Sequence, residues 1–174
     1  KGVWRGRPLQ FFFTVEHDKI IELAKDWYSG QYPKAKLHEE FVINAYSDYH
    51  TRVDLVVVRK DSDDNYVLHG VEAKSGKDGD DVGRLGEQMD GYSQTCMYSE
   101  VWLPPHALTE VRRFVNEYSG LVTVSHSGKI KDYTRPKSSQ DQLQPKQFLK
   151  PLWKDELFEI IDRFDVTLSD EAGY

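Results

Sequence analysis

The sequence predicts an α/β domain in which helices flank a central mixed β-sheet. Three features of the 174-residue chain support this fold class. Segments rich in Val alternate with segments in which apolar residues recur at helical spacing. Three strand-like segments follow one another early in the chain, joined by turns. The later strands are separated by helical segments, so we expect a meander followed by crossover strands around one core.

The first predicted element is a helix over residues 14–28. Thr14 is expected to be its N-cap and Gly30 to end it. Its apolar stripe at helical spacing consists of Ile20, Leu23, Ala24 and Trp27. Glu16 precedes Ile20 by four residues, which predicts that Glu16 lies on the same inward stripe.

The rest of the chain predicts five strands and three more helices. Strands are expected within residues 39–50, 52–60, 66–76, 99–105 and 120–124. Helices are expected over residues 80–96 and 107–118. The first of these has an apolar face made of Val82, Leu85, Met89, Tyr92 and Cys96. We expect one domain over residues 1–174, with its core at about 14–125, a basic loop at 126–150 and a C-terminal helix at 151–165.

The overall charge argues against a bulk-basic nucleic-acid binder, because the formal net charge is −6. The charge is uneven, however, and residues 121–150 contain six Lys or Arg against two Asp. This pattern fits an acidic cation site with phosphate-holding edges and fits an ordinary acidic protein equally well. No apolar run approaches a membrane span, and no signal peptide is visible. The single Cys96 excludes an internal disulfide, so we predict an intracellular, cytoplasmic protein without a membrane partner.

Three charged residues interrupt two Val-rich strands. Glu72 and Lys74 share a strand face, since successive side chains alternate. If the two strands pair through the turn at 61–65, Asp54 falls near Glu72 at the end away from that turn. Buried charges are costly unless they are paired or bind a metal. We therefore expect a site at this edge of the sheet, covered by Glu16 from the first helix.

Divalent metal chemistry suits this set of side chains. Mg²⁺ takes oxygen ligands, commonly one or two carboxylates with waters and phosphate. A cation between two carboxylates relieves their repulsion. A metal so held activates water and polarises a phosphate, and a neighbouring lysine offsets developing charge. Carboxylates with a lysine two residues away therefore indicate phosphodiester hydrolysis.

The sequence Asp54 followed by Glu72-Ala73-Lys74 resembles the signature of the PD-(D/E)xK nuclease superfamily, with Val53 in place of the usual Pro. Gln88 and Tyr92, on the following helix, resemble the Gln-x-x-x-Tyr motif of the RecB-like branch. The resemblance implies a restriction-endonuclease-like fold and a Mg²⁺- or Mn²⁺-dependent deoxyribonuclease. DNA would be the partner, in a chain acting alone, as a homodimer or within a larger nuclease complex.

The resemblance also implies roles for individual residues. Asp54 and Glu72 would be metal ligands, with the Ala73 carbonyl as a third, and Glu16 would complete the metal shell. Lys74 would be the catalytic lysine. Gln88 would orient the lysine or substrate, and Tyr92 would support it or pack beneath. The basic loop, with Lys129, Lys131 and Arg135, would line a nucleic-acid path.

Plainer interpretations stay open at this point. The three charges could form ordinary surface pairs. Glu39 or Glu40 could replace Glu16, and Gln88 could be a solvated helix residue. His17, next to Glu16, attracts only mild attention. The alternative function is a non-catalytic nucleic-acid-binding or protein-interaction domain that retains the same fold.

Overall fold

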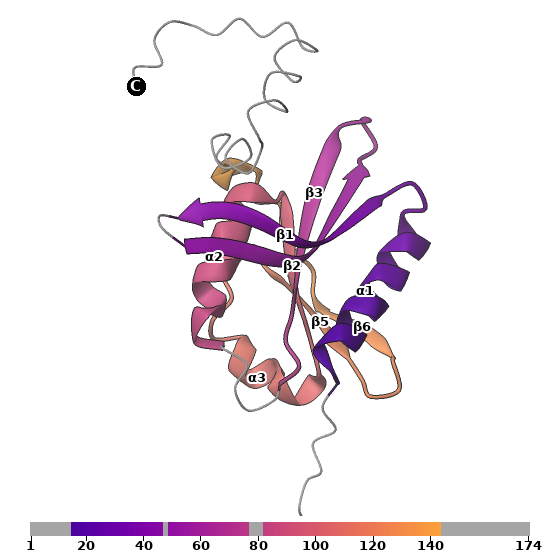
Figure 1. Cartoon of the computed structure of the whole chain (residues 1–174), viewed down its shortest axis with the longest axis vertical. Helices are drawn as coiled ribbons and strands as arrows, with labels where there is room; N and C mark the ends of the chain where they lie inside the picture. The colour runs from indigo at the N-terminus through magenta and orange to yellow at the C-terminus, as the bar shows by residue number, and fades with distance from the viewer. Residues whose placement is uncertain (1–14, 47–48, 77–81, 144–174) are drawn as a thin grey trace, which may run out of the picture.

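The computed structural model describes residues 15–46, 49–76 and 82–143, which form a mixed sheet flanked by helices (Figure 1). The strands are β1 (Lys36–Tyr46), β2 (Tyr49–Lys60), β3 (Tyr66–Ala73), β4 (Tyr98–Leu103), β5 (Gly120–Val124) and β6 (Ile130–Thr134). The helices are α1 (His17–Gln31), α2 (Leu85–Thr95) and α3 (Leu108–Val111). Short 3₁₀ turns occupy Val82–Arg84, Pro105–Ala107 and Gln140–Gln142.

The six strands lie in the sheet in the order in which they occur along the chain. β1, β2 and β3 form an antiparallel meander, and β3, β4 and β5 are parallel. β6 returns antiparallel to β5. The crossovers between the parallel strands contain α2 and α3. This arrangement confirms the predicted mixed sheet with a meander first and crossovers later.

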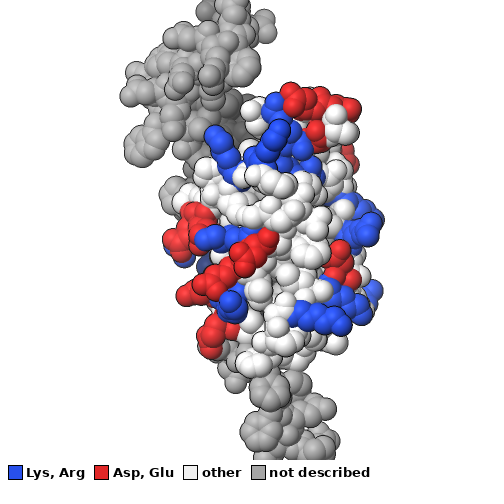
Figure 2. All heavy atoms as spheres, turned by 90° about the vertical axis from the view of Figure 1, so that its right-hand side faces the viewer, with Lys and Arg blue, Asp and Glu red and all other residues white. Residues whose placement is uncertain are grey.

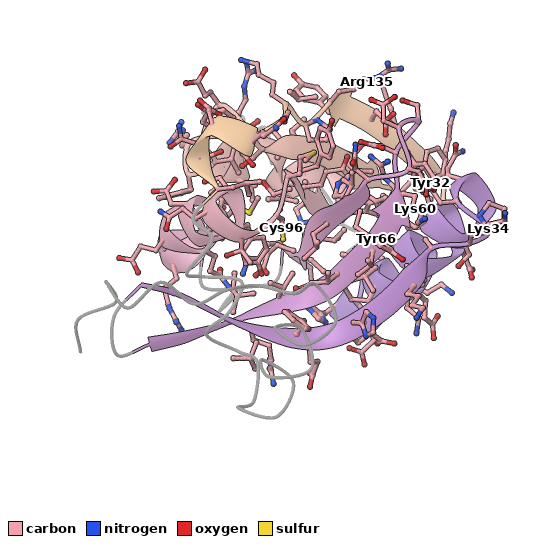
Figure 3. The ribbon with its side chains drawn as sticks, turned by 90° about the horizontal axis from the view of Figure 1, so that it is seen from above. Tyr32, Lys34, Lys60, Tyr66, Cys96 and Arg135 are labelled. Carbon is pink, nitrogen blue, oxygen red and sulfur yellow. The ribbon has the colours of Figure 1, made fainter. Side chains whose placement is uncertain are left out.

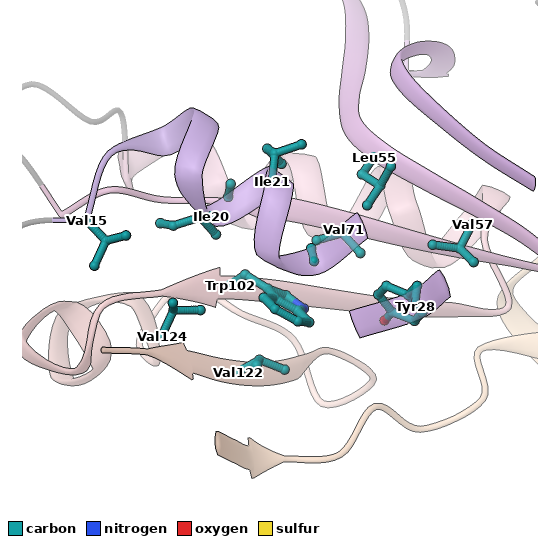
Figure 4. Packing of buried hydrophobic residues seen from close by; sticks show 12 residues of the cluster. Val15, Ile20, Ile21, Tyr28, Leu55, Val57, Val71, Trp102, Val122 and Val124 are labelled. Carbon is teal, nitrogen blue, oxygen red and sulfur yellow. The ribbon is translucent and has the colours of Figure 1, made fainter. Parts of the chain in front are cut away.

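One core lies between α1 and the sheet (Figure 4). The buried helix residues are Ile20, Ile21, Ala24 and Tyr28. Their spacing turns one stripe of the helix towards Leu55, Val71 and Trp102 of the sheet. Leu23 and Trp27 of the predicted stripe pack at its margin. Burial of this stripe fixes the start of α1 against β2 and β3.

A second core lies on the opposite face, under α2. Leu85, Met89 and Tyr92 are fully buried there, as the sequence predicts. They pack against Val56 and Val101, among other residues of the sheet. Because the same face of α2 also carries Gln88, this packing determines where Gln88 lies relative to β3.

The limits of α1 differ from those expected. Thr14 lies outside the described residues, and the helix begins at His17 after Glu16 in extended conformation. The prediction that Gly30 ends the helix is wrong, because α1 continues to Gln31. Tyr32 leaves the helix with φ −133° and ψ 78°. Pro33 explains this end, since a proline disfavours helical geometry in the preceding residue.

Three later expectations also change. The helix expected over 80–96 begins with a 3₁₀ turn at Val82 and becomes α-helical only at Leu85. The helix expected over 107–118 is confined to Leu108–Val111. The segment predicted as a basic loop contains the strand β6, whose residues are mostly exposed and so lack an apolar alternation. The helix expected at 151–165 lies outside the described residues.

Candidate active site

The site forms where β2 and β3 separate. The ladder between these strands ends at the pair Leu55 and Val71, although β3 continues to Ala73. β1 bends at the same level, where Glu40 has a left-handed φ of 52°. Asp54 lies in the resulting gap, and its Oδ2 accepts a hydrogen bond of 2.8 Å from the Ala73 N–H. A carboxylate therefore replaces the strand partner at this point, and we call it the β2–β3 fork.

Glu72 is the buried carboxylate of the fork, with 3% of its side chain exposed. Its Oε1 lies 2.9 Å from the Lys74 Nζ. Its Oε2 accepts a hydrogen bond from the Tyr92 hydroxyl, which also lies 3.1 Å from the Arg52 carbonyl oxygen. A buried charge needs such partners to offset its lost hydration. Glu72 is thus held in one place by β3 itself and by α2.

Lys74 lies at the opening of this buried pair. Its side chain is 11% exposed, and its Nζ lies 3.4 Å from the Gln88 Oε1. The Lys74 backbone N–H donates to the Trp102 carbonyl at 2.9 Å, which fixes the chain just after β3. Gln88 and Tyr92 project from one face of α2, as their four-residue spacing predicts. The ammonium group is therefore positioned by Glu72 and Gln88 together.

The electrostatics of the fork raise the pKa of Glu72. Burial raises the pKa of Glu72, and the nearby Asp54 carboxylate raises it further. Lys74 and the Tyr92 hydroxyl act in the opposite direction but do not cancel the effect. Burial and the Glu72 charge together hold the pKa of Tyr92 well above its usual range, so Tyr92 remains a hydrogen-bond donor. Asp54 and Glu72 are thus close enough to repel.

His17 is a further residue of the fork, and the sequence signals it only faintly. Its Nε2 lies 3.2 Å from the Asp54 Oδ2. Burial alone would lower the pKa of His17, but the Asp54 and Asp18 carboxylates outweigh it and raise that pKa above 6.5. The imidazole is therefore biased towards its charged form and balances Asp54. The only indication in the sequence was a histidine in the first turn of a helix next to an acidic residue.

Glu16 does not occupy the position expected for it. Its side chain is exposed and it precedes the helix, so the prediction that it lies on the inward stripe of α1 is wrong. The phase of the helix is the reason, because α1 begins at His17 and turns Ile20 and Ile21 inward. His17, not Glu16, is the residue of this segment that reaches Asp54.

The two acids considered in place of Glu16 line an open hollow beside Asp54. The hollow has a volume of about 290 Å³. Glu39 forms an ion pair with Lys25, and Glu40 lies 3.4 Å from the Arg52 guanidinium. The carboxylates on this side are therefore partly neutralised, and the hollow gives solvent access to Asp54 from the α1 side.

A divalent metal at the fork would have few protein ligands. Within residues 15–46, 49–76 and 82–143, no group of three or more His, Cys, Asp or Glu side chains is arranged to hold a metal ion. The fork provides two neighbouring carboxylates, Asp54 and Glu72. The backbone of Ala73, which lies between Glu72 and Lys74 in the sequence, contacts Asp54. Mg²⁺ commonly binds one or two carboxylates and keeps several waters, so this set fits Mg²⁺ or Mn²⁺.

The three basic residues expected along a nucleic-acid path do not form one group. β5 runs parallel to β3, so the β5–β6 turn with Lys129 lies at the same end of the sheet as Lys74. Lys131 lies in β6, on the sheet edge three strands from β3. Arg135 follows β6 and lies at the opposite end of the sheet. All three are exposed, but only Lys129 is placed at the site end.

Comparison with known proteins gives one result. A family model described as Bacteriophage P4 protein cII matches residues 19–172. No curated protein and no solved structure matches the chain. Across the part of the chain that the structure describes, no helix combines the length and the apolar character that crossing a membrane requires.

Proposed function

The chain belongs to the family of bacteriophage P4 protein cII, whose description names no reaction, and we propose that it is a metal-dependent nuclease that hydrolyses phosphodiester bonds in DNA. The observation that carries the proposal is the convergence of Asp54, Glu72 and Lys74 at the β2–β3 fork. Asp54 lies on the other side of the β2–β3 turn from Glu72 and Lys74, yet the fold brings it to the end of β3 beside them.

The arrangement is similar to that of the PD-(D/E)xK superfamily, and we propose a restriction-endonuclease-like fold. The support is the element order: a helix, a three-stranded antiparallel meander, a helix that follows the lysine strand, and a parallel strand. The Gln-x-x-x-Tyr spacing adds a further likeness, because both Gln88 and Tyr92 touch the site residues. Val53, in place of the usual Pro, is a buried residue of β2 next to Asp54.

Mg²⁺ or Mn²⁺ is the cofactor of this proposal. Asp54, Glu72 and the Ala73 carbonyl would hold it. When bound, the ion would supply Lewis-acid polarisation of the phosphate and a water of lowered pKa. Its charge would also stabilise the ionised form of Glu72, whose pKa is raised by burial and by Asp54. The residues present therefore suit the ion in charge as well as in ligand type.

Lys74 is the catalytic residue for charge stabilisation. Its ammonium is held at 2.9 Å from Glu72 and 3.4 Å from Gln88, in a site that is mostly shielded from water. A fixed positive charge in such surroundings stabilises negative charge developing on a phosphate more strongly than one in bulk water. Gln88 is a positioning residue, since it acts on the lysine.

His17 positions Asp54. The Ala73 N–H and the His17 Nε2 both contact the Asp54 Oδ2, so that oxygen is fixed from two directions. The other carboxylate oxygen has neither of these contacts. Since a site works best when its ligands are fixed before substrate binds, His17 contributes by orientation.

A non-catalytic domain with the same fold is the second candidate, and one observation favours it. Each oxygen of Glu72 already has a donor, from Lys74 and from Tyr92. A charge set that neutralises itself could have only a structural role. The two candidates differ in their prediction for added metal. The nuclease binds the ion at the fork, whereas a set of charges with only a structural role binds none.

The test is cleavage of closed circular and linear duplex DNA with Mg²⁺ or Mn²⁺. We expect nicking or shortening by the wild type, and a loss of about 10²–10³ in rate for Lys74→Ala, the cost of removing one charge-stabilising group. Lys19→Ala is the matched control, because Lys19 is exposed and pairs with Glu22 on α1. Equal activity of Lys74→Ala and the control, or no metal-dependent cleavage by any of them, would refute the nuclease.

A further inference from the structure

A second hollow lies at the end of the sheet opposite the fork, between the end of α1 and the β2–β3 turn. It has a volume of about 980 Å³. Its basic and aromatic lining consists of Tyr32, Lys34, Lys36, Arg59, Lys60 and Tyr66. We call this surface the basic groove. Figure 3 shows four of these residues, Tyr32, Lys34, Lys60 and Tyr66, close together in the view from above.

The aromatic rings of the groove are open to solvent. Tyr66 is 70% exposed and Tyr32 is 37% exposed. The Lys60 ammonium lies 5.2 Å from the Tyr66 ring centre, and the Arg59 guanidinium lies 4.7 Å from that of Tyr32. Each exposed ring is thus accompanied by a cation.

The floor of the groove is rigid. Arg59 also faces the Tyr98 ring at 5.7 Å, so its guanidinium is held between β4 and the end of α1. The Arg59 Nε is buried and has no hydrogen-bond partner among the residues that the structure describes. Beneath it, Tyr28 donates to Glu100 at 2.8 Å and lies 2.8 Å from the His69 Nε2. The cations and rings are therefore displayed on a fixed support.

The charge of the groove is opposite to that of the whole chain. Four Lys or Arg line it with one acid, Asp64, which pairs with Lys60 at 2.7 Å. The net charge of the chain is −6. Figure 2 shows Lys and Arg atoms gathered at the upper end of the α1 side, with carboxylates beside them. Two further acids, Asp61 and Asp63, lie in the β2–β3 turn and are not part of the groove lining.

We propose that the basic groove binds a single-stranded nucleic acid, with phosphates on Lys34 and Lys36 and a base stacked on Tyr66. Exposed aromatic rings beside cations form the stacking platform and charged track by which single strands are bound without sequence preference. An acidic peptide would use the cations but would leave the rings uncovered, so the rings favour the nucleic acid.

The groove lies far enough from the fork to be a separate surface. α1 connects His17 at the fork with Gln31 at the groove, a rise of roughly 20 Å for a helix of this length. The groove would hold a strand at a distance from the site where the proposed nuclease cuts it. The biological purpose of the groove in this inference rests on the proposed nuclease function. Binding of a strand at the groove, however, needs neither metal nor cleavage.

The experiment measures the anisotropy of a fluorescein-labelled oligothymidylate of about 16 nucleotides, at the upper end of known single-strand site sizes, with EDTA present. We expect Tyr66→Ala to weaken binding about tenfold and Tyr66→Phe, which keeps the ring, to bind within about twofold of wild type. Lys34→Ala with Lys36→Ala should reduce the slope of log K against log salt by about 1.4, since each phosphate contact on a single strand contributes about 0.7.

The matched control removes two cations elsewhere. Arg112→Ala with Arg113→Ala changes exposed residues just after α3, at the opposite end of the molecule in Figure 1, and should bind as the wild type does. An equal loss of oligothymidylate affinity in the control and in the groove variants would overturn the proposal. So would displacement by polyglutamate combined with no effect of Tyr66→Ala, which would indicate an acidic protein partner. Because the binding is measured in EDTA, without metal-dependent cleavage, failure of the nuclease and failure of the groove are separable.

Discussion

Glu72 has the most buried charged side chain of the fork, since Lys74 and Asp54 are both more exposed. It is almost fully buried, and its charged form is disfavoured first by burial and then by Asp54. A stable fold would gain little from such a carboxylate, because buried ion pairs are often no better than well-packed apolar residues. Groups with perturbed pKa values are frequent at functional sites, and the raised pKa of Glu72 is one reason for the catalytic site that we propose here.

The raised pKa of Glu72 predicts how stability depends on pH. The folded state binds this proton more tightly than the unfolded chain, so the free energy of unfolding should fall as pH rises from about 4.5 through the folded pKa. Urea unfolding of wild type and Glu72→Gln over this range, without divalent metal, measures the effect. The fall should be smaller in Glu72→Gln. Parallel curves for the two proteins would show that Glu72 titrates normally.

His17 should titrate above 6.5, because the Asp54 carboxylate outweighs the effect of burial. Histidine resonances followed by NMR across the pH range measure this pKa. We expect Asp54→Asn to lower it more than Asp18→Asn does, since Asp54 is the larger of the two influences. The stabilising contribution of the charged imidazole is present below 6.5 and is lost as pH rises through the folded pKa. An unchanged pKa in Asp54→Asn would remove His17 from the site.

The sequence was sufficient to find Asp54, Glu72 and Lys74, because strand alternation and one turn determine where they meet. The same reasoning failed for the orientation of Glu16 and gave His17 only mild attention. Which side chain of a helical first turn points inward depends on the residue at which the helix begins. That residue was taken to be Thr14, but the helix starts at His17. Asp54 also lies in a gap in the ladder, which no alternation pattern reveals.

At the scale of elements, the site depends on how closely α2 approaches β3. A side chain at Gly70 would place its Cβ 3.1 Å from the Cys96 Sγ and 3.3 Å from the Tyr92 Cδ2. Both neighbours are fully buried and have little room to move. Glycine at this position therefore allows the Tyr92 hydroxyl to reach Glu72.

Gly70→Ala should lower the free energy of unfolding by about 1–3 kcal/mol, the usual cost of overpacking a core. It should also displace Tyr92 from Glu72. The double variant Gly70→Ala with Cys96→Ala removes the nearer clash and should recover part of that loss, measured by chemical denaturation. If the double variant loses the sum of the two single effects, the close contact is not the cause.

The elements also divide by how readily the sequence predicts them. β2, β3 and α2 carry strong apolar patterns, and each overlaps the segment expected for it, although α2 becomes α-helical only at Leu85. β6 was missed because it is a mostly exposed edge strand that depends on pairing with β5. α3 was overestimated in length, since residues 112–118 have helical composition but form turns after Val111. Local propensity was overridden there by the need to lead the chain back into β5.

At the scale of the whole molecule, one sheet connects the fork and the basic groove. α1 spans the distance between them and is packed along its length against the sheet. The buried bonds from Tyr28 to His69 and Glu100 tie the end of α1 to β3 and β4. Burial would raise the pKa of Glu100, but hydrogen bonds from His69, Trp102 and Tyr28 outweigh it and lower that pKa. The fork and the basic groove are thus connected through the same packed elements, which no local pattern in the sequence indicates.

The central claim is that Asp54 and Glu72 share one divalent ion at the β2–β3 fork. Titration with Mn²⁺, with the free ion followed by electron paramagnetic resonance, tests it most directly. We predict about one ion per chain for the wild type at up to millimolar concentration, and weak or no binding by Asp54→Asn. Asp132→Asn, an exposed acid in β6, should bind as the wild type does. Failure of the wild type to bind Mn²⁺, or undiminished binding by Asp54→Asn, would contradict the claim.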